Sequence, residues 1–130
     1  SQRSQTARNV DRLIDDARWA VGQASAAAAA TDLGRVAGAW PVMRDHFIDI
    51  ERAAANIHTD DAPLAAAVDE VGRATAELRG ALDAFVNALG RHSDGHLDAL
   101  EPIRSDVTVG SDNLSTRIQA LISARSPLSI

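Results

Sequence analysis

Apolar residues recur at alternating intervals of three and four through positions 33–57. The positions that follow this spacing are Leu33, Val36, Trp40, Met43, Phe47, Ile50, Ala54 and Ile57. A heptad spacing of this kind places one narrow apolar stripe along a long helix, whereas a strand would need alternation at every second residue. The pattern therefore predicts a helix over about 32–58 that buries its stripe against neighbouring helices.

Comparable stripes predict three more helices, over about 5–30, 62–89 and 94–125. The third helix has an uninterrupted stripe made of Leu64, Val68, Val71, Thr75, Leu78, Leu82, Phe85 and Leu89. Thr31 or Asp32 is placed to cap the second helix and Asp61 to cap the third, and Gly90 is placed to end the third. Each predicted helix is thus bounded by residues suited to helix ends.

The fourth helix has the weakest pattern. Residues 105–113 contain serine, β-branched residues and glycine, all of which are poor helix formers. A break in this stretch, with a new cap at Ser111 or Asp112, is an open alternative to one continuous helix.

Prolines interrupt two of the predicted helices. Pro41 removes a backbone donor in the middle of the second helix and crowds the carbonyl of Ala37. Because the heptad keeps its phase across Pro41, a continuous kinked helix is favoured over a chain break at Trp40. Pro102 predicts a second kink, in the fourth helix.

Helices of similar length joined by short turns pack as antiparallel neighbours. The predicted fold is all-α, with residues 1–130 forming one domain. Its architecture is an antiparallel up-down-up-down four-helix bundle, about 40 Å long, with kinks at Pro41 and Pro102. Both ends of the chain are then expected at the same end of the bundle.

Composition narrows the function classes. The 130-residue chain has a net charge of −5, which argues against nucleic acid as a partner, because phosphate binding needs a basic face. The absence of cysteine excludes disulfides and thiolate zinc sites.

No apolar run approaches the ~20 residues that cross a bilayer. Because the chain starts without methionine, we interpret it as an excised or processed domain whose membrane-anchoring flanks are absent.

Counting residues from the predicted turns places Trp19, Trp40, Pro41 and Pro102 at one height of the bundle. Kinked helices open space that large aromatic side chains can line, so this layer is a candidate place for a ligand cavity. The arginines within about one turn of it are Arg18, Arg44, Arg79 and Arg104. An inward-pointing arginine could hold a ligand carboxylate with two parallel hydrogen bonds. Alternatively, the tryptophans fill the volume and the arginines are solvated.

Histidines supply a weaker candidate. His92 and His96 lie four residues apart with Asp94 between them, a set that could bind zinc or another transition metal. The alternative is that they are ordinary polar turn residues. His46 could bind haem, but Met43 lies on the same helix and cannot reach the opposite haem face. No cofactor is therefore predicted.

Catalysis has no sequence support. The chain contains no nucleophile elbow, phosphate-binding loop, dinucleotide-binding turn or zinc-protease motif. The adjacent acidic pairs fall in turns or on polar helix faces, where solvated carboxylates are typical. We do not expect an enzyme.

The residues that carry a family resemblance are the helix of 8–30, the heptads of 33–57 and 64–89, and the closing segment 113–122. In length, pattern and terminus placement they resemble the extracytoplasmic four-helix-bundle sensor domains of bacterial chemoreceptors and related histidine kinases. The resemblance implies a periplasmic domain, joined to the membrane by flanking segments. Such a domain binds a small ligand and transmits a helix displacement, commonly as a homodimer.

Two other functions stay open at this point. One is a soluble, cytoplasmic bundle that binds proteins or serves a structural role without any ligand. The other is a small metal- or haem-binding bundle. In the sensor hypothesis a ligand near Trp19 and Trp40 favours one packing of the fourth helix over another, and the weak stretch 105–113 is where that movement costs least.

Overall fold

The computed structural model describes residues 1–91 and 97–126 and contains four long helices. These are α1 (Gln2–Ala29), α2 (Leu33–Ala55), α3 (Ala62–Arg91) and α4 (Glu101–Arg125), with a short 3₁₀ helix, η1 (Leu97–Leu100), directly before α4. No strand occurs among the described residues. The predicted all-α four-helix bundle is confirmed.

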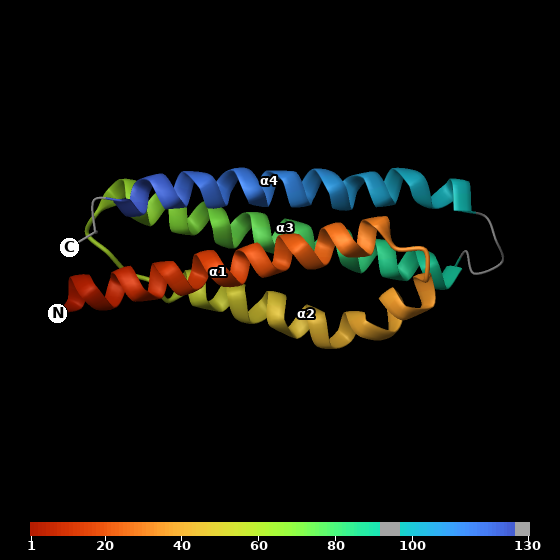
Figure 1. Ribbon diagram of the computed structural model, residues 1–130, viewed down its shortest axis with the longest axis horizontal. Helices are drawn as coiled ribbons and strands as arrows, with labels where there is room; N and C mark the ends of the chain where they lie inside the picture. Colours follow the sequence, from red (N-terminus) through yellow and green to blue (C-terminus); the bar gives the residue numbers. More distant parts are fainter. Residues whose placement is uncertain (92–96, 127–130) are drawn as a thin grey trace.

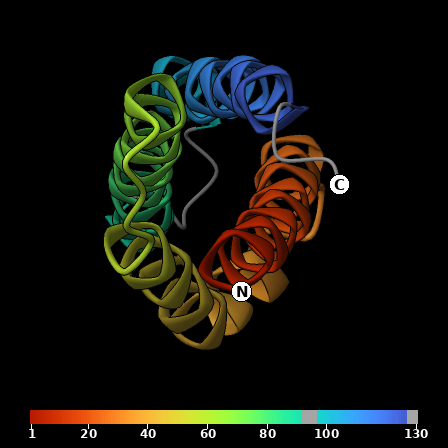
Figure 2. The same cartoon turned by 90° about the vertical axis from the view of Figure 1, so that its left-hand side faces the viewer.

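The four helices lie side by side along the long axis of the molecule (Figure 1). Following the colours from red to blue, successive helices run in opposite directions, so α1 begins at the end of the bundle where α4 finishes. Viewed end-on, α1, α4, α3 and α2 follow one another around a central core (Figure 2). Packing is most extensive between α3 and α4, and it is much less extensive between α1 and α2.

The core contains the apolar stripes that the heptads predict. Every stripe position of α3 is buried, including Thr75, whose hydroxyl donates a hydrogen bond of 2.7 Å to the carbonyl of Val71. In α2 only Trp40, Phe47, Ile50 and Ala54 of the stripe are buried, and its other members are half-buried. The second helix therefore lies closer to the edge of the core than the third.

The predicted caps of the second and third helices are confirmed. Asp32 accepts a hydrogen bond of 3.1 Å from the backbone N–H of Arg35, and Asp61 accepts one of 3.1 Å from that of Leu64. α2 runs through Pro41 as one unbroken helix, so the alternative of a chain break at Trp40 is excluded.

Two expectations about helix ends are wrong, and the open alternative of a break in the fourth helix is excluded. Pro102 lies in the first turn of α4, where a missing N–H costs nothing, so it does not kink a helix interior. Gly90 does not end α3, because the helix continues to Arg91. α4 is continuous through 105–113, because Val107 and Ser111 are buried there, and burial outweighs poor helix propensity.

Candidate functional site

Both tryptophans pack against one phenylalanine of α2. Phe47 is fully buried, and its ring centroid lies 6.0 Å from that of Trp19 and 5.6 Å from that of Trp40, both in edge-on geometry. Trp40 is buried, whereas Trp19 is 38% exposed and also packs edge-on against His46, at 5.3 Å. Phe47 thus lies in the layer that the sequence offers as a candidate place for a ligand cavity.

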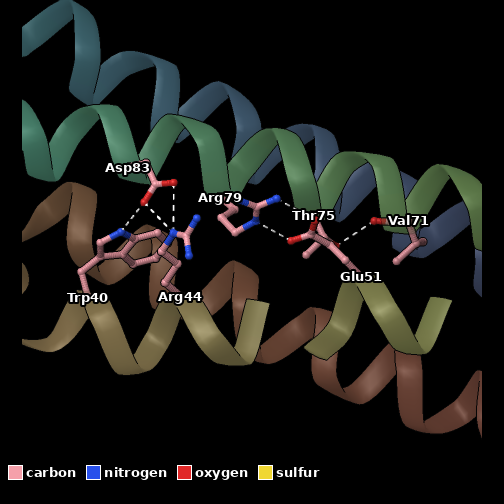
Figure 3. Close-up of polar contacts among 7 residues, drawn as sticks. All are labelled: Trp40, Arg44, Glu51, Val71, Thr75, Arg79 and Asp83. Carbon is pink, nitrogen blue, oxygen red and sulfur yellow. Dashed lines mark hydrogen bonds and ion pairs between the residues drawn. The ribbon is translucent and has the colours of Figure 1, made fainter. Parts of the chain in front are cut away.

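Trp40 and Arg44 converge on an acidic side chain that the sequence reasoning missed. The indole Nε1 of Trp40 donates a hydrogen bond of 2.6 Å to Asp83 of α3 (Figure 3). The Nε of Arg44 lies 3.2 and 3.3 Å from the two carboxylate oxygens of the same residue. The structure therefore brings two predicted ligand-binding residues together, around a carboxylate supplied by the protein itself.

Arg79 also pairs with a carboxylate across the α2–α3 interface. Its Nε and Nη2 donate hydrogen bonds of 2.6 and 2.9 Å to the two oxygens of Glu51 (Figure 3). This two-pronged hydrogen bonding raises the pKa of Arg79 above its usual value. We call the five residues Trp40, Arg44, Glu51, Arg79 and Asp83 the α2–α3 clamp, because they join these two helices through charged hydrogen bonds.

Arg104 lies at a different interface. Its Nη1 donates a hydrogen bond of 2.8 Å to the carbonyl of Ala28, in the last turn of α1, and its guanidinium lies over the ring of Phe85 at 5.7 Å. A cation at this position satisfies a carbonyl that a helix C-terminus leaves unpaired. Arg18, the remaining predicted arginine, is exposed on α1.

The predicted metal ligands His92, His96 and Asp94 lie outside the described residues. Within 1–91 and 97–126, no group of three or more metal-ligating side chains comes together. His46, the haem candidate, is exposed beside Trp19, and Met43 is half-buried.

A polar cleft of about 790 Å³ lies where the first turns of α1 meet the α2–α3 connection. Carboxamides, hydroxyls and charged or titratable side chains line it, and its lining residues are Gln2, Arg3, Gln5, Thr6, Asn9, Asn56, Ile57, His58, Thr59, Asp60 and Asp61. The amide of Gln5 donates a hydrogen bond of 3.0 Å to Asn9, and Asp61 is engaged as the α3 cap. The α1 residues of the cleft are polar and recur every three or four positions, so the sequence indicates a polar helix face here. The sequence does not indicate which other residues lie against that face.

Two residues beyond Asn9, α1 is tied to the last turn of α4. Arg125 donates hydrogen bonds of 2.7 and 3.0 Å to the two carboxylate oxygens of Asp11. These hydrogen bonds hold the pKa of Asp11 below its ordinary value of 3.8 and raise that of Arg125. The cleft and this ion pair therefore involve adjacent turns of the same helix.

No described helix is both long enough and apolar enough to span a membrane. No protein-family model matches the chain, and comparison with curated proteins and with solved structures yields no significant match.

Proposed function

We propose that this chain is the extracytoplasmic ligand-sensing domain of a bacterial transmembrane receptor, with the polar cleft as its ligand site. The observation that supports this proposal is the position of the cleft. It lies between α1 and the α2–α3 connection, at the end of the bundle where α1 begins and α4 ends (Figure 1). A ligand bound there touches the helix whose displacement would be transmitted to the membrane.

The cleft favours a small, polar ligand with hydroxyl or amide groups. Its volume falls within the range of about 300–1,000 Å³ that small-molecule sites occupy. Carboxamides such as those of Gln5, Asn9 and Asn56 can both donate and accept hydrogen bonds, which suits hydroxyl or amide groups of a ligand. We therefore expect polyols, sugars or small amides to bind better than apolar compounds.

Transmission would depend on how α1 is attached to the other helices. α1 packs mainly on α4, and its contact with α2 is limited. The Asp11–Arg125 ion pair would carry a shift of the first turns of α1 to the last turn of α4. A ligand changes the populations of two packings only if it binds one of them more tightly. A ligand that bridges α1 and the α2–α3 connection meets that condition when the displacement of α1 changes the width of the cleft.

Binding is tested by thermal denaturation and titration calorimetry with a panel of neutral polyols, sugars, amides, amino acids and organic acids. A ligand should raise the melting temperature, and Asn56→Ala should weaken its binding about tenfold by removing a cleft carboxamide. Gln119→Ala is the matched control, because this exposed carboxamide lies on α4, outside the cleft lining. Equal losses of affinity in the two variants would place the ligand elsewhere.

Transmission is tested separately by spin labelling. The chain has no cysteine, so the double variant Arg12→Cys and Ser123→Cys takes labels only at these exposed positions of α1 and α4. The ligand should change the distance between the labels by about 1–2 Å, the size of known helix shifts in signalling. If the ligand binds and the distance between the labels does not change, the chain binds a ligand but does not transmit a helix displacement. Failure of the whole panel to bind would favour the rival function, a helical interaction module without a ligand.

A further inference from the structure

A second, smaller hollow lies beside the end of α1, where that helix crosses the middle of α4. It has a volume of about 230 Å³, and its lining residues are Ser25, Ala28, Ala29, Thr108, Ser111 and Asp112. This volume exceeds the roughly 150 Å³ of an engineered protein cavity that binds benzene. The hollow therefore has room for an organic molecule of a few carbon atoms.

The three hydroxyl groups of the lining direct their protons at other protein atoms. The hydroxyl of Ser111 lies 3.5 Å from the carbonyl of Val21, to which it donates, and the hydroxyl of Ser25 lies 3.1 Å from that of Ser111. Thr108 donates a hydrogen bond of 3.4 Å to the carbonyl of Arg104. Because each hydroxyl has one proton and two lone pairs, what these groups can still offer a ligand is acceptors.

The lining also has negative charge. Asp112 is exposed, and no described side chain forms a hydrogen bond or an ion pair with its carboxylate. α1 ends at Ala29 without a basic residue in its last turn, so the negative end of the helix dipole lies at the same hollow. Arg104 lies two turns before Asp112 and already donates to the carbonyl of Ala28. A cation in the hollow would therefore meet a carboxylate that has no competing partner.

We propose that this hollow binds the ammonium group of a small primary amine. An ammonium group has three N–H donors, which match the carboxylate of Asp112 and the hydroxyl oxygens of Ser25 and Thr108. Its single charge equals that of one carboxylate, whereas a divalent metal ion takes six or more oxygen ligands. The methyl groups of Ala28 and Ala29 supply an apolar part of the lining for two or three carbon atoms of the amine.

This site is independent of the polar cleft. The cleft lies at the first turns of α1, whereas the hollow lies at its last turns, and the two share no lining residue. Over the 20 positions from Asn9 to Ala29, a rise of 1.5 Å per residue separates them by about 30 Å. Binding at one site can therefore be distinguished from binding at the other by where the chain responds.

Nuclear magnetic resonance of the ¹⁵N-labelled full chain at pH 7 tests this proposal, with ethanolamine hydrochloride added to about 50 mM. The amide signals of residues 25–29 and 108–112 should shift with a dissociation constant of about 1–10 mM, because one exposed ion pair and a few hydrogen bonds give a weak affinity. Ethylene glycol, which has a hydroxyl in place of the ammonium group, and potassium chloride should produce no saturable shifts there. Shifts confined to residues 2–9 and 56–61 would place the amine in the polar cleft and overturn the proposal. The absence of any shift over the whole titration would also overturn it.

Two variants test the charge and the space of the hollow separately. Asp112→Asn should weaken ethanolamine binding at least about tenfold by removing the charge. Asp106→Asn is its matched control, because Asp106 is an exposed carboxylate of α4 outside the lining. Ala29→Leu should abolish binding by filling the hollow, whereas Ala26→Leu, at an exposed position of the same helix outside the lining, should have no effect. An affinity that Asp112→Asn and Ala29→Leu leave unchanged would contradict the proposed site.

Discussion

The α2–α3 and α1–α4 interfaces are held together by different means. α2 and α3 are joined by long polar side chains, with Trp40 and Arg44 on Asp83 and Glu51 on Arg79 (Figure 3). Where the last part of α1 crosses the middle of α4, the two helices are joined by small residues, and the hydroxyls of Ser25 and Ser111 lie 3.1 Å apart. There Ser111 is buried, and its hydroxyl also lies 3.5 Å from the carbonyl of Val21.

This difference indicates which helices can move. Charged hydrogen bonds fix the relative position of two helices, because a shift of one turn would leave carboxylates and guanidiniums unpaired. Between α1 and α4, the described residues form such bonds only near the two ends of α4, from Arg104 to the carbonyl of Ala28 and from Arg125 to Asp11. A small hollow of about 230 Å³, lined in part by Ser25, Thr108 and Ser111, opens to the surface beside this interface. We therefore expect the proposed displacement to occur between α1 and α4, while α2 and α3 keep their relative position.

The largest effect is expected from Asp83→Ala in the α2–α3 clamp. It leaves the buried Nε1 of Trp40 without an acceptor and Arg44 without its ion-pair partner, and it should cost about 2–3 kcal/mol in the free energy of unfolding. Urea denaturation measures this cost. Asp69→Ala, at an exposed position of the same helix, should stay within about 0.5 kcal/mol of the wild type. Equal losses in the two variants would show that the clamp contributes nothing.

Ser111→Leu tests the close approach of α1 and α4. The larger side chain would force α1 away and should cost about 2 kcal/mol by overpacking. Ser111→Ala keeps the interface narrow, and Ser25 is exposed enough to bond to water, so the loss should be below about 1 kcal/mol. Urea denaturation of both variants gives the comparison. A leucine that is tolerated as well as alanine would mean that this interface is not closely packed.

The Glu51–Arg79 ion pair allows a double-mutant test of how strongly α2 and α3 are joined. Both side chains are partly buried, at 20% and 24% exposure, so Glu51→Leu should cost about 1–2 kcal/mol by leaving Arg79 unpaired. Adding Arg79→Leu should recover most of that loss, because two apolar side chains replace the pair. If the double variant loses as much as the sum of the single variants, the two residues are not coupled.

The smallest effect is expected from pH, at the Asp11–Arg125 ion pair. Because the folded-state pKa of Asp11 lies below 3.8, the folded protein binds fewer protons than the unfolded chain as the pH approaches that value from above. The stabilisation is therefore present above pH 3.8 and is lost as the pH falls through the folded-state pKa. Asp11 is 53% exposed and screened by solvent, so the change should stay below about 1 kcal/mol. Urea denaturation at several pH values, with Asp11→Asn as the control, measures it. A variant with the same acid dependence as the wild type would contradict this assignment.

Local and periodic signals in the sequence were enough for much of the fold. The heptads of 33–57 and 64–89 predicted two helices and their buried faces, and Asp32 and Asp61 predicted where those helices begin. Pro102 misled the prediction because its effect depends on whether it lies in the first turn or the interior of a helix. One-dimensional spacing did not settle that boundary.

The candidate site was less predictable. The positions of Arg44 and Arg79 suggested ligand binding, but Asp83 and Glu51 from the neighbouring helix already meet them. The polar cleft joins residues 2–9 to residues 56–61, which no local pattern connects.

By itself, the sequence of this protein determined that four helices form and which residues of the two heptads are buried, because both depend on neighbours within one or two turns. Only the tertiary structure decided which carboxylate each arginine meets, where a cleft opens and which helices are joined by small residues. These features depend on the rotation and axial position of one helix against another, which the packing of all four helices sets together.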